Sequence, residues 1–275
     1  MKVGILCSSN LNSFNHKVLE HIVNLHNDKL ACCYIDVRPG KSFLKKSVFH
    51  IKKRQGSYIF FMSAGNLFRA KQPALSAEDF CSRYNIPVFK TDDPYSERTL
   101  DSIRSEKIDI LVYLSGFGTI IRKPLLEIAP LGVLSYHHGN MREYRGQPAA
   151  FWELYNGEAE MGATVQRINE WIDTGMPIVE KIIPIHPTDT YNILRERLYS
   201  ETPEMMAEAL KRYETDDFRP CRLENYGTLY RIPSAKEYLI LRYRVFRRRR
   251  KWLLSQASKQ LMFNYVSAQQ KTKLK

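Results

Sequence analysis

The strongest constraint on the fold is the alternation of short apolar runs with segments of helical periodicity along the first 114 residues. The apolar runs predict strands at 2–7, 30–37, 86–89 and 108–114. The segments between them predict helices around 14–25, 76–84 and 97–106. Strands that alternate with helices form parallel sheets with right-handed crossovers. The pattern therefore predicts an α/β fold, with a mostly parallel sheet flanked by helices.

The second half of the chain continues this pattern less regularly. The predicted elements are a short helix from Pro124, a strand at 132–137, a helix at 147–156, strands at 162–168 and 178–185, and a helix at 190–213. Residues 41–72 interrupt the alternation, and we interpret them as a helical insertion on the sheet edge or as a lid. For 275 residues, we expect one large domain over 1–213 and an extension over 214–275.

The composition excludes disordered, collagenous and low-complexity chains and an integral membrane protein. Hydrophobic residues make up 44% of the chain, as in an ordinary globular protein. No uncharged apolar run approaches the roughly 20 residues of a spanning helix, and the apolar start is too short for a secretory signal. The five cysteines are odd in number and form no CxxC pair, which favours reduced thiols. We therefore expect a cytoplasmic protein.

Positive charge is concentrated at the end of the sequence. Residues 231–275 contain 13 Lys or Arg and one acid, so they hold +12 of the net +13, and residues 1–230 hold +1. Residues 236–263 combine apolar side chains at helical spacing with the basic run Arg247–Lys251. This predicts a basic amphipathic helix. Three interpretations stay open: a helix packed on the domain with a solvated basic face, a contact with an anionic membrane surface, or a contact with RNA.

Two polar side chains lie on one face of the predicted strand at 132–137. Strand alternation places Ser135 and His137 on one face, and Tyr136 and His138 on the other. Because α/β sheets bind ligands at the carboxyl ends of their parallel strands, His137 is well placed for function. No metal-ligand spacing such as HExxH surrounds either histidine, so we expect no metal.

A series of motifs in order gives the sequence a family resemblance. The motifs are Leu114-Ser-Gly-Phe-Gly-Thr-Ile-Ile121, Pro124–Gly132, Ser135-Tyr-His-His-Gly139, Tyr144-Arg-Gly146, Trp152–Glu158, Gly162–Val165 and Ile172-Asp-Thr-Gly175. Together they resemble the 10-formyltetrahydrofolate-dependent formyltransferases, which include the glycinamide ribonucleotide, methionyl-tRNA and nucleotide-sugar amine enzymes. The resemblance covers about residues 1–210 and implies a Rossmann-like formyltransferase domain, here followed by a basic helical C-terminal extension.

The resemblance also implies catalytic residues. The family moves a formyl group from the folate to an amine with an Asn-x-His strand motif and an Asp in a D-x-G turn. By position, the histidine is His137 and the acid is Asp173, whereas Ser135 stands where the family has asparagine. That asparagine would donate to the developing oxyanion. A serine hydroxyl donates from a shorter arm, and Asn140 could supply a substitute amide.

Two sets of binding residues are expected. In the family, backbone groups of two segments hold the folate pteridine, and the corresponding residues are Gly118, Thr119, Ile120, Ile121, Ile168, Asn169 and Trp171. Ser9 and Asn10 follow the first strand and would offer N–H groups at a helix start to an anionic acceptor. Without the resemblance, Asp173 would be read as a carboxylate that caps its own turn, and Ser135 as a structural hydroxyl.

The expected function is formyl transfer from 10-formyltetrahydrofolate to a primary amine on an anionic acceptor. The acceptor we favour is an amino sugar bound to a nucleotide or lipid carrier in surface-glycan assembly, with the enzyme cytoplasmic or peripheral at the inner face of the membrane. One rival keeps folate binding but has lost or altered activity, because Ser135 replaces the asparagine. The other rival is an RNA-binding protein that acts through the basic tail.

Overall fold

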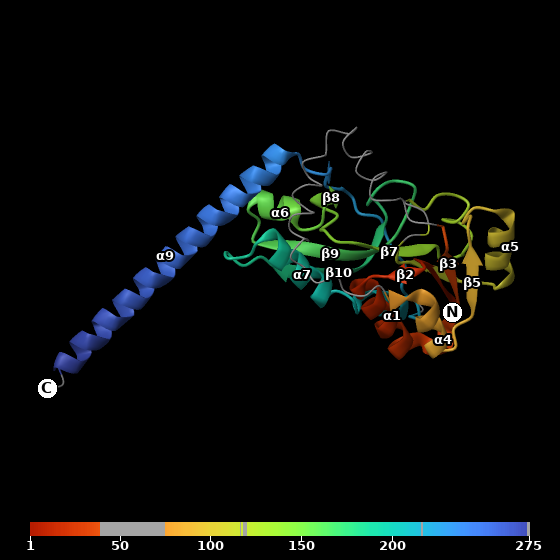
Figure 1. Cartoon of the computed structure of the whole chain (residues 1–275), viewed down its shortest axis with the longest axis horizontal. Coiled ribbons are helices and arrows are strands. Elements are labelled where there is room, and N and C mark those ends of the chain that lie inside the picture. The colour runs from red at the N-terminus through yellow and green to blue at the C-terminus, as the bar shows by residue number, and fades with distance from the viewer. Residues whose placement is uncertain (39–74, 116, 118–119, 216, 274–275) are drawn as a thin grey trace.

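The computed structural model describes residues 1–38, 75–115, 117, 120–215 and 217–273. The predicted insertion at 41–72 lies outside these residues. Seven strands form one sheet in the order β10-β9-β7-β6-β1-β3-β5 (Figure 1). Their bounds are β1 Val3–Ser8, β3 Leu30–Asp36, β5 Val88–Thr91, β6 Ile110–Tyr113, β7 Val133–His137, β9 Glu160–Arg167 and β10 Met176–Pro184.

Five of these strands are parallel, and two complete the sheet in antiparallel register. β1 pairs in parallel with β3 and β6, and β6 pairs in parallel with β7. β9 runs antiparallel to β7, which places His137 opposite Thr164, and β10 runs antiparallel to β9. The mostly parallel sheet expected from the sequence is confirmed. The same register places Leu134, near the start of β7, opposite Arg167 at the end of β9, where the turn to β10 begins.

Helices cover both faces of the sheet. α1 (Ser13–His26) and α8 (Met205–Arg212) pack in one apolar cluster with Ile5 and Val165. α5 (Glu97–Ser105) packs in a second cluster on the other face, with Leu6 and Leu111. Since successive side chains of β1 enter different clusters, the strand is buried on both faces, as in other doubly covered parallel sheets.

Side-chain caps fix where the helices start. The Asn12 side chain accepts from the Asn15 N–H at 2.8 Å before α1, and Ser76 accepts from Asp79 at 3.1 Å before α4 (Ala77–Arg83). Such caps satisfy N–H groups that have no partner within the helix. The remaining short elements are η1 Asn27–Lys29, β2 Asn10–Leu11 and β4 Leu75–Ser76, of which β2 and β4 pair with each other.

Three predicted helices differ in the structure. Residues 123–130 form turns instead of a helix from Pro124, since a second proline at 130 leaves too short a segment. α6 (Phe151–Asn156) starts later than predicted, because Ala150 has a left-handed φ of 67°. The helix expected over 190–213 is two helices, α7 (Tyr191–Glu201) and α8, separated at Pro203. Proline lacks an N–H and disfavours helical conformation in the residue before it.

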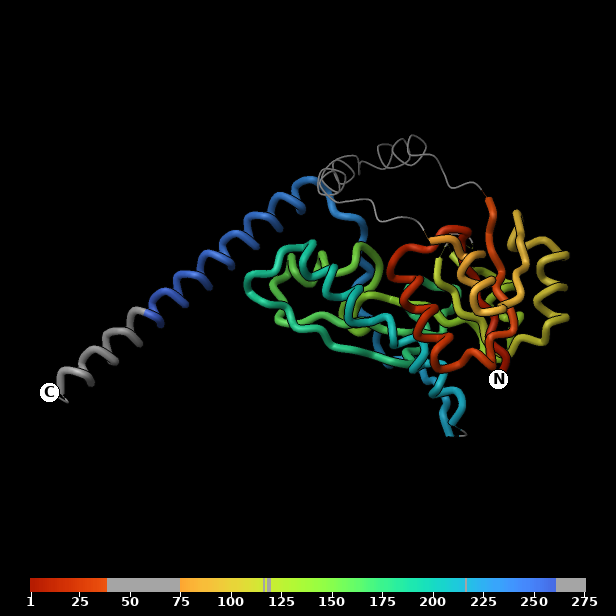
Figure 2. Tube along the Cα trace, turned by 60° about the horizontal axis from the view of Figure 1, so that its bottom comes forward, coloured from red at the N-terminus to blue at the C-terminus, as the bar shows by residue number. Residues whose placement is uncertain are grey.

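The C-terminal part of the chain returns to the domain before it leaves. β11 (Thr228–Tyr230) pairs in parallel with β8 (Tyr144–Gly146). α9 (Ala235–Lys273) then packs at its start, where Leu241 and Val245 are buried. In Figure 2 the coloured part of α9 that follows extends away from the α/β body. The boundary at residue 213 stays a proposal, but the residues beyond it contact the domain closely.

Polar contacts reinforce the packing at the start of α9. Arg244 donates to the Tyr155 carbonyl and lies over the Tyr155 ring at 4.4 Å. Arg248 donates to the carbonyls of Pro187 and Asp189 at 3.0 and 2.9 Å. The first half of the basic helix is thus docked on the domain. Among the described helices, none combines the length and apolar character needed to cross a membrane.

We expect Leu241→Ala to lower the free energy of unfolding by about 2–4 kcal/mol, because the side chain is 2% exposed and its loss leaves a cavity. Leu239→Ala is the matched control on the same helix, since Leu239 is 55% exposed. Urea denaturation of both variants measures the difference. Equal, small effects would mean that α9 is not docked in solution.

Candidate active site

His137 ends β7 and is almost fully buried, at 6% exposure. Its Nδ1 lies 3.3 Å from the Asp173 Oδ2, and its Nε2 lies 2.8 Å from the Tyr144 carbonyl oxygen. Both neighbours are hydrogen-bond acceptors. A neutral imidazole carries only one N–H, so only the imidazolium can donate to both oxygens. The geometry therefore favours a charged His137.

The pKa directions of the pair agree with this geometry. Burial alone would lower the pKa of His137, but the hydrogen bond and negative charge of Asp173 outweigh burial, and the pKa lies above its usual value. Burial would raise the pKa of Asp173, but His137 and the Gly146 N–H stabilise the carboxylate, and its pKa lies below the usual value. The imidazolium of His137 and the carboxylate of Asp173 thus stabilise each other as a hydrogen-bonded pair.

Adjacent His138 behaves in the opposite way. Its ring stacks on Tyr136 at 5.4 Å between centroids and meets Phe14 and Tyr199 edge-on. Burial lowers the pKa of His138 to about 3, with a smaller contribution from the charge of His137. Strand alternation thus places two neighbouring histidines in different environments, and His138 is a neutral packing residue.

Asp173 is held by the turn between β9 and β10. It has a left-handed φ of 49°, a conformation that aspartate tolerates better than most residues. Its Oδ2 accepts from the Gly146 N–H at 2.8 Å, and its Oδ1 accepts from the Gln166 Nε2 at 3.3 Å. Asn169 stabilises the same turn, because its Nδ2 donates to the Thr174 carbonyl at 2.7 Å. The carboxylate is therefore oriented from several directions.

Gly146 connects this site to the C-terminal part of the chain. Its φ is +89°, and a Cβ there would lie 2.0 Å from the Tyr230 carbonyl oxygen, so no other residue fits. Tyr230 also stacks on Tyr144 at 5.2 Å and on Trp152 at 4.9 Å. β11 thus forms a wall of the site. The cavity between Tyr230 and His137 measures only about 10 Å³, enough for about one water.

Ser135 lies on β7 two residues before His137 and is half-buried. Its partner in the β7–β9 register is Gln166, whose Oε1 accepts from the Gly175 N–H at 3.0 Å. The structure thus brings a carboxamide to the position opposite the serine. We did not single out Gln166 from the sequence. Its spacing in the sequence could have indicated it: Gln166 is two residues after Thr164, so both lie on one face of a strand, and it is seven residues before Asp173.

Glu153 is a second residue that sequence reasoning missed. It lies in α6, is 3% exposed, and lines the His137 cavity as well as the neighbouring cavity over β9 and β10. Burial raises the pKa of Glu153 to about 7, and the charge of His137 opposes this shift in part. The sequence did contain a signal for Glu153, because an acidic residue between Trp152 and Leu154 is unusual within an apolar helix segment.

The residues predicted to bind an acceptor lie at separate places. Ser9 follows β1, which is two strands from β7 in the sheet, and its hydroxyl donates to the Asp36 carbonyl at 3.1 Å. Asn10 is exposed in β2. The Asn140 Oδ1 accepts from the Arg142 N–H at 3.1 Å, and its side chain lines the cavity over β9 and β10. Arg145, which we did not single out, lines the His137 cavity and donates to the Gly227 carbonyl at 2.7 Å.

The two segments predicted to hold the folate lie against each other. Lys123 forms an ion pair with Glu170 at 3.3 Å, and Ile168 packs on the cluster that contains Ile121. Ile120 and Trp171 are 46% and 75% exposed. Gly118 and Thr119 lie outside the described residues.

Comparison with known proteins shows which family the chain belongs to. A model of the formyl transferase family matches residues 64–210, more than half of the chain. The chain belongs to the formyl transferase family. Methionyl-tRNA formyltransferase of Trichlorobacter lovleyi is 29% identical over 161 residues, which cover 58% of this chain and 51% of the relative. The chain thus spans about half the length of the curated relatives it matches.

Solved structures share the formyl transferase fold. The N-formyltransferase of Helicobacter canadensis, in complex with folinic acid and dTDP-3-aminofucose, has a TM-score of 0.53 at 16% identity, covering 84% of this chain and 71% of that one. Glycinamide ribonucleotide transformylase 1 of Symbiobacterium toebii has a TM-score of 0.54 at 16% identity, covering 82% and 94%. The Rossmann-like formyl transferase fold expected from the sequence is confirmed.

We expect the buried Glu153 carboxyl to make stability fall as pH rises. Between about pH 4.5 and 7 the unfolded chain releases this proton while the folded chain retains it, so folding loses about 3 kcal/mol across that window. Glu153→Gln has no titrating carboxyl at this position. The stability of this variant relative to the wild type should therefore be higher at pH 8 than at pH 5. Urea denaturation at both pH values measures this change.

Glu160→Gln, on the exposed start of β9, controls for the change from carboxylate to amide. If the stability difference between Glu153→Gln and the wild type were the same at both pH values, the Glu153 carboxyl would be solvated.

Proposed function

We propose that this chain transfers a formyl group from 10-formyltetrahydrofolate to a primary amine on an anionic acceptor, an amino sugar linked to a nucleotide or a lipid carrier. The folate supplies the formyl carbon: the amine forms a new C–N bond to it, the bond to the folate N10 breaks, and the amine proton ends on N10. The observation that carries the proposal is the buried His137–Asp173 pair at 3.3 Å in a member of this family.

His137 would stabilise charge and carry the proton in this reaction. Its Nδ1 faces Asp173, so the hydrogen on Nε2 is the one that can reach a substrate. The Tyr144 carbonyl oxygen lies 2.8 Å from Nε2, accepts that hydrogen, and occupies the position that an acceptor oxygen of the substrate would take. Negative charge that develops on the formyl oxygen would be met by the imidazolium, and Asp173 would keep the ring charged and oriented.

A second donor to the formyl oxygen would come from the Ser135 position. The Ser135 hydroxyl is on the same strand face as His137, and Gln166 lies opposite it. A carboxamide nitrogen carries two hydrogens, and the bond to Asp173 uses one of them. Ser135 and Gln166 together could thus replace the single asparagine amide of the family. Asn140 stays a candidate, although its oxygen already accepts a hydrogen bond from the Arg142 N–H.

The apolar surface beside the site fits a folate ring. Ile120, Trp171 and Ile172 are exposed, and they belong to the two segments that meet near Lys123 and Glu170. Exposed aromatic and aliphatic side chains beside a polar site are typical of ligand pockets. The Helicobacter canadensis structure, which holds folinic acid, supports this assignment.

The acceptor's negative charge would meet Arg145. Its guanidinium donates to the backbone carbonyls of Gly227 and Ile172 at the edge of the His137 cavity. Its charge is therefore available to an anionic group. The dTDP-3-aminofucose in the Helicobacter canadensis structure supports an amino sugar nucleotide as acceptor. Ser9 and Asn10 follow the carboxyl end of β1, at the same edge of the sheet as His137 at the end of β7, where a larger acceptor could reach them.

We expect His137→Ala and Asp173→Asn to lower turnover by about 100- to 10,000-fold, because each removes the proton carrier or its orienting charge. The measurement is tetrahydrofolate release from 10-formyltetrahydrofolate with a panel of amino sugar nucleotides. His138→Phe is the matched control, since it preserves aromatic packing on the other strand face.

If His138→Phe lost as much turnover as His137→Ala, the loss would reflect packing and the catalytic assignment would fail. The wild type could instead bind 10-formyltetrahydrofolate but release no tetrahydrofolate with any acceptor. In that case the rival interpretation, a folate-binding protein without transfer activity, is correct.

We expect Ser135→Asn to keep or raise turnover and Ser135→Ala to reduce it, because the loss of one oxyanion donor typically costs about 10²–10³ in rate. The same assay compares the three proteins. Equal rates would place Ser135 outside the chemistry, and Asn140→Ala and Gln166→Met would then identify the donor.

A further inference from the structure

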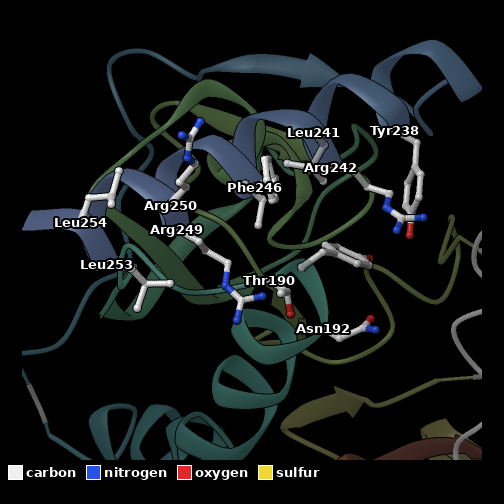
Figure 3. A pocket seen from close by; sticks show the side chains of 12 residues that line it. Thr190, Asn192, Tyr238, Leu241, Arg242, Phe246, Arg249, Arg250, Leu253 and Leu254 are labelled. Carbon is white, nitrogen blue, oxygen red and sulfur yellow. The ribbon is translucent and has the colours of Figure 1, made fainter. Parts of the chain in front are cut away.

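A cavity between α7 and α9 shares no lining residue with the His137 cavity. It measures about 690 Å³, within the range of small-molecule sites. We call it the α7–α9 groove, and Figure 3 shows the twelve side chains that line it. Its apolar floor includes Leu241 and Val245, and its rim carries the exposed side chains of Phe246, Leu253 and Leu254.

Three arginines of α9, Arg242, Arg249 and Arg250, line the same groove. No acidic residue lines it, and within the described residues no ion pair to a carboxylate is formed by these three guanidiniums. The nearby carboxylate of Asp189 is already occupied, because Arg197 contacts both its oxygens at 2.6 and 2.7 Å. The groove thus combines an aliphatic floor with three uncompensated positive charges.

The start of α7 adds a further preference for anions. Thr190 caps this helix, and Tyr191 and Asn192 follow it at the groove wall. Helix N-termini carry partial positive charge. Figure 3 shows Arg249 and Thr190 lining the groove from α9 and from the start of α7. Positive charge therefore comes to the groove from both helices.

We propose that the α7–α9 groove binds an anionic phospholipid of a membrane surface, with its phosphate on the arginines and an acyl chain on the aliphatic floor. A second copy of this chain fits poorly, because two α9 helices would bring their arginines together. RNA would stack its bases on aromatic side chains, and the groove has three of these: Tyr191, Tyr238 and Phe246. The groove also has four aliphatic side chains, which base stacking does not use and an acyl chain does: Leu241, Val245, Leu253 and Leu254. A lipid satisfies both features at once, because its phosphate is anionic and its acyl chain is apolar.

Vesicle binding by the full chain tests this assignment. The wild type should bind phosphatidylcholine vesicles that contain phosphatidic acid, but not pure phosphatidylcholine. The triple variant Arg242→Gln, Arg249→Gln, Arg250→Gln should bind about 100-fold more weakly, since each basic residue near an anionic surface contributes roughly a fivefold factor. Urea denaturation confirms that each variant is folded.

The matched control removes the same charge from the same helix outside the groove. Arg247→Gln, Lys251→Gln, Lys259→Gln should weaken binding by less than about tenfold. If both triple variants lose binding equally, α9 acts as an unspecific basic helix and the groove assignment is wrong.

The apolar half of the assignment has its own pair of variants. Leu253→Asn with Leu254→Asn should weaken vesicle binding at least tenfold, whereas Leu239→Asn, exposed but outside the groove, should not. Unchanged binding in the double variant would exclude an acyl chain from the groove. Wild-type protein that ignores the anionic vesicles, or that retains RNA in their place, would also overturn the proposal.

Discussion

The Asp173 carboxylate joins three strands, β7, β8 and β9. It pairs with His137 at the end of β7, accepts from Gly146 in β8, and accepts from Gln166 in β9. Its own position depends on the turn between β9 and β10. A buried carboxylate is unfavourable without partners, and here it has one cation and two hydrogen-bond donors. The site is therefore a single network, and the local folds around it depend on each other.

Sequence periodicity predicted the fold well where a local rule determined the structure. Apolar runs correctly placed the parallel strands, and the alternation within β7 correctly separated His137 from His138. The predictions failed where backbone conformation outweighed periodicity. Pro203 divides one predicted helix into two, and the left-handed Ala150 delays the start of α6. Periodicity measures side-chain burial and does not report such backbone constraints.

The candidate site shows a different limit. The family resemblance pointed to His137 and Asp173, which lie within hydrogen-bonding distance in the structure. Gln166 and Glu153 were missed, because a single polar residue in an apolar segment has no distinctive spacing. Their importance comes from what packs around them: Gln166 faces Ser135 across the sheet, and Glu153 is buried near an imidazolium. Such pairings depend on tertiary contacts, which one sequence does not reveal.

The contact between Gly146 and Tyr230 also has a consequence for synthesis. β8 is complete when residue 146 leaves the ribosome, but its partner β11 is made more than 80 residues later. During that interval the loop beside His137 has no strand to pair with. The nascent chain can form the parallel sheet early, whereas the pocket wall is closed only after Tyr230 has emerged from the exit tunnel. The wall beside His137 would therefore be among the last parts of this site to form during translation.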